Sequence, residues 1–131
     1  MQHVPAFLAI LAFAVVSFSL KRRRPSTPAL LPQEAWAALH RSQDLQLIDL
    51  RTPQEFSEAH LAGARNIPLT DLEARLPEIH PERPLLVYCW LDGRSRQALK
   101  ILKTHGYRRA QAIAGGIEAW KKAGLSIDTP S

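Results

Sequence analysis

The chain's only cysteine, Cys89, stands between an apolar run and a stretch with helical periodicity. The loop that follows it contains a glycine and two arginines, Gly93, Arg94 and Arg96. A helix amino terminus carries partial positive charge and free N–H groups, which favour a thiolate over a thiol. Although a lone cysteine is most often a small packing residue, this context leads us to expect that Cys89 is substantially ionised at neutral pH and acts as a nucleophile.

Two kinds of thiolate chemistry would use such a loop. Cysteine phosphatases have a Cys-x5-Arg loop that wraps a tetrahedral phosphate, whereas the spacing here is Cys-x4-Arg to Arg94 and Cys-x6-Arg to Arg96. A shorter loop suits a smaller target, such as one extra sulfur atom carried on the thiolate, and its N–H groups would stabilise that anion. Asp92 places an acidic side chain in this loop.

The elements that must position the cysteine alternate between strand and helix. Apolar runs predict strands, and apolar residues at helical spacing predict helices. The expected strands are residues 29–31, 45–51, 84–89 and 110–113, and the expected helices are residues 32–42, 52–60, 70–79, 94–106 and 117–124. This alternation over short loops predicts an α/β fold with a mostly parallel central sheet and helices on both faces.

Three of the expected helices have a residue suited to their first turn. Thr52 is expected to cap the helix that starts with Pro53, and Thr70 is expected to cap the next one in a capping box with Glu73. Ser95 is expected to be the N-cap of the helix that follows the cysteine loop. Two consecutive glycines at 115–116 predict a tight turn before the last helix.

The amino-terminal part of the chain has a different composition from the rest. Residues 4–20 are without charge, and residues 21–24 are four consecutive cations. We expect residues 1–24 to form a single transmembrane helix with a cytoplasmic basic flank, followed by a cytoplasmic domain at residues 25–131. A cleaved signal with a periplasmic domain is the alternative.

Composition excludes several other classes of function. Beyond residue 24 the chain has thirteen Lys and Arg against twelve acidic residues, so its charge balance does not indicate nucleic-acid binding. One cysteine excludes an internal disulfide and a cysteine-built metal cage, and the five histidines have no metal-ligand spacing. We expect no metal site and no cofactor.

Four segments that follow one another along the chain resemble the rhodanese-like sulfurtransferase family, single-domain type. The segments are residues 47–56, with Asp-x-Arg and Glu-Phe; 56–67, with His60; 87–95, the cysteine loop; and 114–120, with Gly-Gly-x-x-x-Trp. One position departs from the pattern, because Asp92 stands where the family usually has glycine. This departure could weaken the binding of dianionic thiosulfate in favour of persulfide donors.

The resemblance implies a rhodanese-like fold and a two-step transfer of sulfur. A sulfane sulfur would pass from an anionic donor, thiosulfate or a persulfide, through a Cys89 persulfide to a thiol or cyanide acceptor. The expected substrate-binding residues are those of the loop: Trp90, Leu91, Asp92, Gly93, Arg94 and Ser95. Asp49 and Arg51 are expected to brace the site, Arg51 through an ion pair with Glu55.

Two other functions remain open at this point. A rhodanese fold that turns over sulfur donors poorly could serve as a binding or sulfur-relay module at the membrane, with Trp90 as a docking residue or hydrophobic lid. A cysteine phosphatase or arsenate reductase would use the same thiolate, although the loop spacing does not match the phosphatase pattern.

Overall fold

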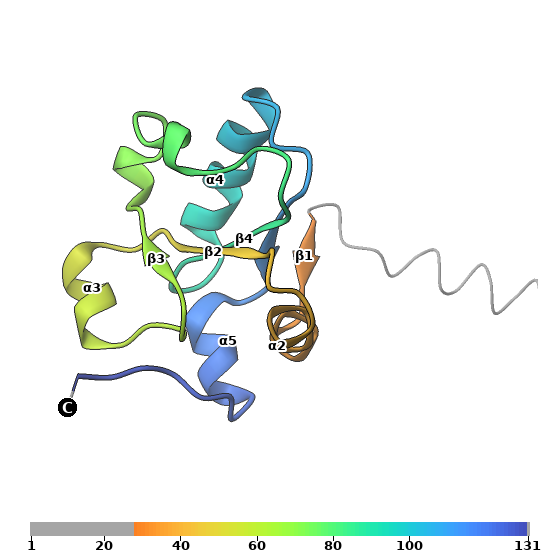
Figure 1. Ribbon diagram of the computed structural model, residues 1–131. Coiled ribbons are helices and arrows are strands. Elements are labelled where there is room, and N and C mark those ends of the chain that lie inside the picture. Colours follow the sequence, from red (N-terminus) through yellow and green to blue (C-terminus); the bar gives the residue numbers. More distant parts are fainter. Residues whose placement is uncertain (1–27, 131) are drawn as a thin grey trace, which may run out of the picture.

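The computed structural model describes residues 28–130. Five strands form one sheet in the order β1-β5-β4-β2-β3, and every pairing between these strands is parallel (Figure 1). The strands are β1 (Ala29–Leu30), β2 (Gln46–Asp49), β3 (Arg65–Asn66), β4 (Leu85–Tyr88) and β5 (Ala110–Ile113). The sequence prediction of a parallel α/β sheet is confirmed.

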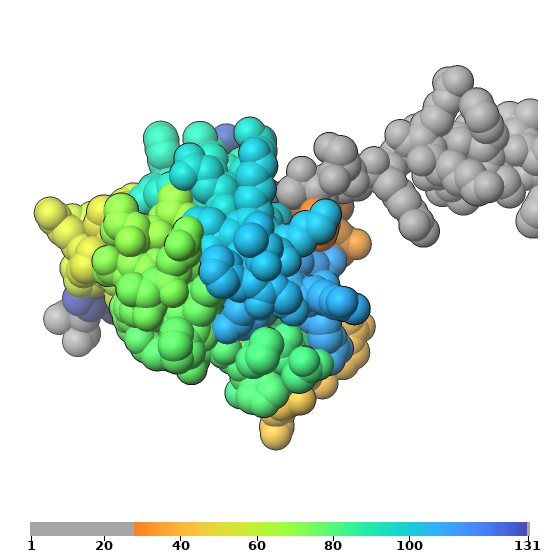
Figure 2. Space-filling model, turned by 90° about the horizontal axis from the view of Figure 1, so that it is seen from above, coloured from red at the N-terminus to blue at the C-terminus, as the bar shows by residue number. Residues whose placement is uncertain are grey.

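Helices cover both faces of this sheet, as expected. The helices are α2 (Pro32–Arg41), α3 (Pro53–Glu58), α4 (Gly93–Thr104) and α5 (Gly116–Lys122), with 3-10 turns η1 (Leu69–Asp71) and η2 (Leu76–Glu78). Helix α4 lies on one side of the sheet, and α2 and α5 lie on the other (Figure 1). In Figure 2 the teal to blue atoms of α4 and the residues after it cover much of one face, beside the yellow-green to green residues between β3 and β4.

Alternation along β4 divides the core into two parts. Leu85, Val87 and Cys89 point into the cluster beneath α4, whereas Leu86 and Tyr88 point into the cluster beneath α2 and α5. All four residues of β4 are buried, as is usual for a central parallel strand covered on both faces. The strand therefore holds the cysteine against the α4 face immediately beyond its carboxyl end.

The helix starts were predicted with mixed success. Thr52 caps α3, as predicted, and the structure adds a reciprocal capping box with Glu55. The helix expected at residues 70–79 with a Thr70 cap was wrong, because this segment forms the turns η1 and η2. Pro77 provides the physical reason: it has no N–H to donate, and it disfavours helical backbone at the preceding residue.

The amino-terminal expectations fall outside the described residues. The transmembrane helix expected at residues 1–24, and most of the linker after it, precede Pro28. Among residues 28–130 the structure contains no helix with the length and apolar character needed to cross a membrane. It also brings together no cluster of His, Cys, Asp and Glu side chains suited to a metal ion within that same range.

Candidate active site

The sulfur of Cys89 lies at the point where strand β4 passes into the loop before α4. The backbone N–H of Ser95 lies 3.4 Å from Sγ, and the Ser95 hydroxyl donates to the same sulfur at 3.2 Å. Cys89 is 1% exposed and Ser95 is 2% exposed. Two hydrogen-bond donors therefore converge on one enclosed sulfur.

Helix α4 begins at Gly93, before the N-cap predicted at Ser95, and this changes the role of Ser95. The N-cap is Asp92, whose side chain makes no capping bond, and the helix starts at Gly93. Ser95 is therefore in the first helical turn and not at the N-cap. Backbone N–H groups in a first turn have no intrahelical acceptor, so the Ser95 amide is available to the sulfur.

The amino terminus of α5 holds the cysteine loop from its outer side. The amide of Ile117 donates to the carbonyl of Cys89 at 2.9 Å, and the amide of Glu118 donates to the carbonyl of Trp90 at 3.3 Å. Since C=O and N–H point in opposite directions across a trans peptide, the N–H groups that follow these carbonyls point away from α5. The contact between α5 and the loop thus sets the orientation of the loop amides.

Gly116 makes this close approach possible. A Cβ atom at this position would lie 2.4–2.6 Å from the carbonyl oxygens of residues 89, 90 and 91. Gly115 and Gly116 also have φ of +76° and +60°, a region that glycine adopts without a steric cost. The predicted tight turn is confirmed, and its second glycine is a packing position for the active loop.

Two side chains tie the loop to the segment around α5. Asp92 Oδ1 accepts a hydrogen bond from the Gly115 amide at 2.8 Å, and Trp90 Nε1 donates to Glu118 Oε1 at 2.9 Å. Asp92 makes no ion pair with Arg94 or another cation among residues 28–130. The unusual acid in the loop therefore has a structural partner in the glycine turn.

Arg94 is engaged by a carboxylate from α3. Its two terminal nitrogens donate to Glu55 at 2.8 and 3.2 Å, and both side chains are about one-third exposed. The hydrogen bond from Arg94 is the main cause that lowers the pKa of Glu55 from 4.5 to about 2. The same carboxylate closes the capping box with Thr52, so Glu55 links the start of α3 to the first turn of α4.

Asp49 and Arg51 form a buried ion pair beside the site. Arg51 donates to both carboxylate oxygens of Asp49, with the shortest contact at 2.8 Å. The pair lies near the ring of Tyr88, where burial and the nearby Asp49 raise the pKa of the phenol. The ion pair expected between Arg51 and Glu55 was wrong, because Asp49 satisfies Arg51 and Arg94 takes Glu55.

Most of the residues predicted for the site lie together, although the sequence did not show how they interact. Cys89 and Ser95 are in direct contact, while Trp90 and Leu91 are 51% and 47% exposed on the outer side of the loop. His60 is a structural residue, since its Nδ1 pairs with the Phe56 carbonyl at 2.8 Å.

Glu55, Gly116 and Glu118 contribute contacts to the site that the sequence analysis missed. Gly116 had a sequence signal in the glycine pair, which predicted a turn but not its contact with the loop, and Glu55 lies three residues after Thr52, where a capping box is possible. Nothing in the sequence marked Glu118 as the partner of the loop tryptophan.

Comparisons with known proteins agree with this geometry. The family model described as "Rhodanese-like domain" matches residues 31–123. A sulfurtransferase of Allochromatium vinosum is 36% identical over 89 residues, which cover 68% of this chain and 83% of that protein. The thiosulfate sulfurtransferase GlpE of Coxiella burnetii is 30% identical over 88 residues, covering 67% of this chain and 81% of its own length.

Solved structures share the fold. A rhodanese-related protein of Thermoplasma volcanium superposes with a TM-score of 0.70 at 21% identity, covering 77% of this chain and 97% of that one. A protein of Rhodopseudomonas palustris whose function is unknown, described as a possible tyrosine phosphatase, gives a TM-score of 0.69 at 28% identity over 79% of this chain and 86% of its own.

Proposed function

The chain belongs to the family of rhodanese-like domains, and on that premise we propose that it is a sulfurtransferase in which Cys89 carries the sulfur. Relatives named as sulfurtransferases support such an activity at the level of the family. The proposed reaction moves a sulfane sulfur from thiosulfate or a persulfide to a thiol or cyanide, in two displacements at one sulfur atom. It needs no cofactor and no metal.

The first displacement loads the enzyme. The Cys89 thiolate attacks the outer sulfur of the donor, a new S–S bond forms, and the donor's own S–S bond breaks with its electron pair leaving on sulfite or on the donor thiolate. The enzyme now carries a Cys89 persulfide whose outer sulfur is anionic. The Ser95 amide and hydroxyl donate to Sγ of Cys89, so they stabilise the attacking thiolate and the same thiolate when the outer sulfur is later removed.

The second displacement unloads it. An acceptor thiolate attacks the outer sulfur and leaves as a persulfide, while the electron pair of the enzyme's S–S bond returns to Cys89 as a thiolate. Cyanide would leave as thiocyanate by the same route. Because the chain has one cysteine, an external acceptor must complete each cycle.

The observation that carries the proposal is the pair of donors on a single enclosed sulfur. Only 1% of Cys89 is exposed, so a slim nucleophile or a terminal sulfur suits the loop better than a bulky aryl phosphate. Arg94 is already paired with Glu55, which leaves the helix start and the loop amides as the main attraction for an anionic donor.

Intact-mass spectrometry of the chain after thiosulfate treatment tests this function. We expect a gain of one sulfur atom, which cyanide removes and which the variant Cys89→Ser does not acquire. Loading by a low-molecular-weight persulfide but not by thiosulfate would identify persulfide as the donor. The absence of any sulfur adduct with either donor would refute the transferase proposal.

A binding or sulfur-relay module is the second candidate, because two large apolar side chains of the loop are half-exposed. Trp90 and Leu91 stand beside the thiol, and the bond from Trp90 to Glu118 fixes the indole in place. Intact sulfur loading in Trp90→Ala, with slower transfer to a protein acceptor than to cyanide, would support a docking role. Hydrolysis of an aryl phosphate that depends on Cys89 would instead favour a phosphatase.

For the location of the protein, we propose a single-pass membrane anchor at residues 1–24 and a cytoplasmic catalytic domain at residues 25–131. The support is the uncharged run followed directly by four cations, which the positive-inside rule places in the cytoplasm. A reporter fused to the carboxyl terminus that is active only in the cytoplasm is the expected result. Activity only in the periplasm would favour a cleaved signal.

A further inference from the structure

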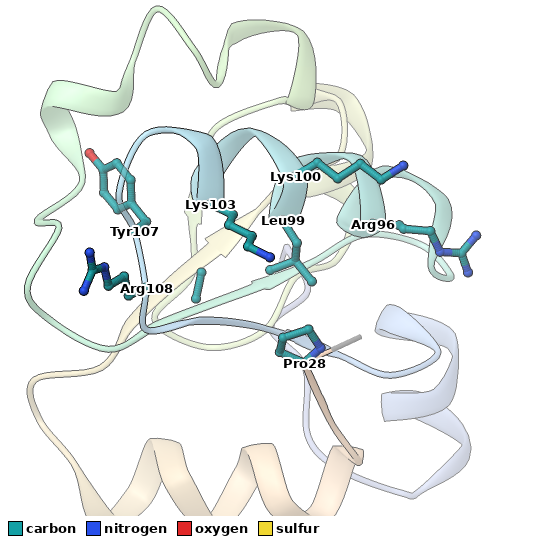
Figure 3. A pocket seen from close by; sticks show the side chains of 8 residues that line it. Pro28, Arg96, Leu99, Lys100, Lys103, Tyr107 and Arg108 are labelled. Carbon is teal, nitrogen blue, oxygen red and sulfur yellow. The ribbon is translucent and has the colours of Figure 1, made fainter. Parts of the chain in front are cut away.

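A basic groove runs beside α4, on the sheet face opposite α5. Its volume is about 640 Å³. In Figure 3 Leu99 lies near the middle of the lining residues and Pro28 lies below it, and cations lie to both sides of Leu99. The groove cations are Arg96, Lys100, Lys103 and Arg108. Cys89 does not line this groove, so it is separate from the candidate active site.

The segment that forms most of the groove carries an excess of positive charge, although the domain as a whole is nearly neutral. Residues 93–117 contain six Lys and Arg and no Asp or Glu, although residues 25–131 together carry almost equal numbers of cations and anions. The four groove cations are exposed, and none of them forms an ion pair within residues 28–130. Uncompensated cations around an apolar floor fit a partner surface that is anionic and has apolar material beneath its charges.

The position of Pro28 in the groove indicates that the anionic partner surface is a membrane. Pro28 lines the groove, and only three residues separate it from the cations at residues 21–24. Four residue steps span at most about 14 Å, so Pro28 stays close to that basic cluster whatever path the chain takes. If residues 4–20 cross the bilayer, the groove is the part of the domain that the chain holds near the headgroups.

We propose that the groove beside α4 docks the domain onto the anionic lipid surface of the membrane that holds its amino-terminal anchor. The proposal rests on the membrane location proposed above and is independent of sulfur transfer. A lipid surface fits better than an acidic protein, because the chain itself delivers the groove to the bilayer. It fits better than the amino-terminal segment folding back, because residues 21–24 would repel the groove cations.

The test measures lysine modification in the full chain embedded in lipid nanodiscs. One preparation uses phosphatidylcholine alone and the other adds phosphatidylglycerol. In the anionic discs we expect acylation of Lys100 and Lys103 to slow by about fivefold or more. One cation near an anionic lipid surface contributes roughly that factor to the equilibrium constant for docking. Lys121 and Lys122, exposed on α5 across the sheet, are the internal control and should not change.

Charge-reversal variants make the test specific. The double variant Arg96→Glu, Arg108→Glu leaves the two reporter lysines in place and should weaken docking by at least about 25-fold, which abolishes their protection. The matched double variant Lys121→Glu, Lys122→Glu has the same net charge and should retain it. The single variant Arg108→Glu, which lies outside the cysteine loop, and the variant Lys121→Glu, Lys122→Glu should load sulfur normally, which separates this proposal from the proposed function.

Three results would overturn the docking proposal. Equal labelling of Lys100 and Lys103 in both kinds of disc would show that anionic lipid does not contact the groove. Equal protection in both kinds, unchanged by the groove variant, would show that another occupant covers it. Failure of the full chain to associate with either disc would remove the anchor and the docking together, with sulfur loading still measurable on its own.

Discussion

The contact between α5 and the cysteine loop makes Gly116→Ala the sharpest perturbation that the structure offers. The new methyl group would lie 2.4, 2.5 and 2.6 Å from three consecutive carbonyl oxygens, those of Cys89, Trp90 and Leu91. These atoms belong to the backbone, so no side-chain rotation can relieve the overlap. The loop, or the start of α5, must move.

The size of the effect follows from these distances. An ordinary van der Waals contact of a Cβ atom begins near 3.4 Å. The carbonyl oxygens must therefore move away from the new Cβ atom by almost 1 Å. A displacement of about 1 Å at a catalytic group can cost about 100-fold in rate. The positive φ of Gly116 adds roughly 1–2 kcal/mol of backbone strain for any residue with a side chain.

Gly124→Ala is the matched control. Gly124 also has a positive φ, +76°, but a Cβ atom there would meet nothing within 4 Å. Urea unfolding should show that both variants are destabilised, Gly116→Ala by several kcal/mol more, because only it disrupts packed backbone. Mass-spectrometric sulfur loading should slow by about 100-fold in Gly116→Ala and remain normal in Gly124→Ala. Equal stability and equal loading in the two variants would refute the role of α5 in shaping the loop.

Three further substitutions test the charges around the sulfur. Ser95→Ala should slow alkylation and sulfur loading of the thiol by about tenfold or more, since a hydrogen bond to a charged acceptor is lost. Asp49→Asn should lower the free energy of unfolding by about 3–5 kcal/mol, because it leaves the buried Arg51 uncompensated. Glu55→Gln should remove roughly 1 kcal/mol, after allowance for solvent screening. Because Arg94 lowers the pKa of Glu55 to about 2, that contribution is present above pH 4.5 and disappears as the pH falls toward 2.

Each of these predictions has a control in the same chain. Ser57→Ala removes an exposed serine hydroxyl on α3 and should leave loading unchanged. Asp44→Asn breaks an exposed ion pair and should cost less than about 1 kcal/mol in urea unfolding. Acid titration of Glu55→Gln should lack the loss of stability below pH 4.5 that the unchanged chain shows; identical acid profiles for the two proteins would contradict the assignment.

The sequence was sufficient for the features that depend on local pattern. The apolar run before Cys89 and the helical spacing after it predicted the strand, the loop and the helix that hold the thiol, and all three are confirmed. Thr52 and Pro53 predicted the start of α3 correctly, because a side-chain cap and a fixed φ act within one helical turn.

The contacts that shape the loop were beyond a reading of the sequence. Gly116 and the carbonyl of Cys89 are distant along the chain, and only the folded arrangement of β4, β5 and α5 brings them together. Glu55 could have paired with Arg51 or Arg94. Arg51 instead pairs with Asp49, two residues before it, and the packing of α3 beside the first turn of α4 brings Arg94 to Glu55. Both outcomes depend on packing between elements, which propensity and spacing do not encode.

Helix α4 contributes to both the thiol site and the groove, but the electrostatic interactions at the two sites differ in kind. Ser95 and Arg96 are neighbours in its first turn, yet Ser95 faces the sulfur and Arg96 faces the groove. The sulfur is enclosed and stabilised by hydrogen-bond donors at contact distance, whereas the groove relies on exposed net charge that counterions screen. At about 1 M salt the screening length is about 3 Å, so lipid docking should be lost while sulfur loading of Cys89 persists. Loss of both at the same ionic strength would mean that the two sites are not electrostatically independent.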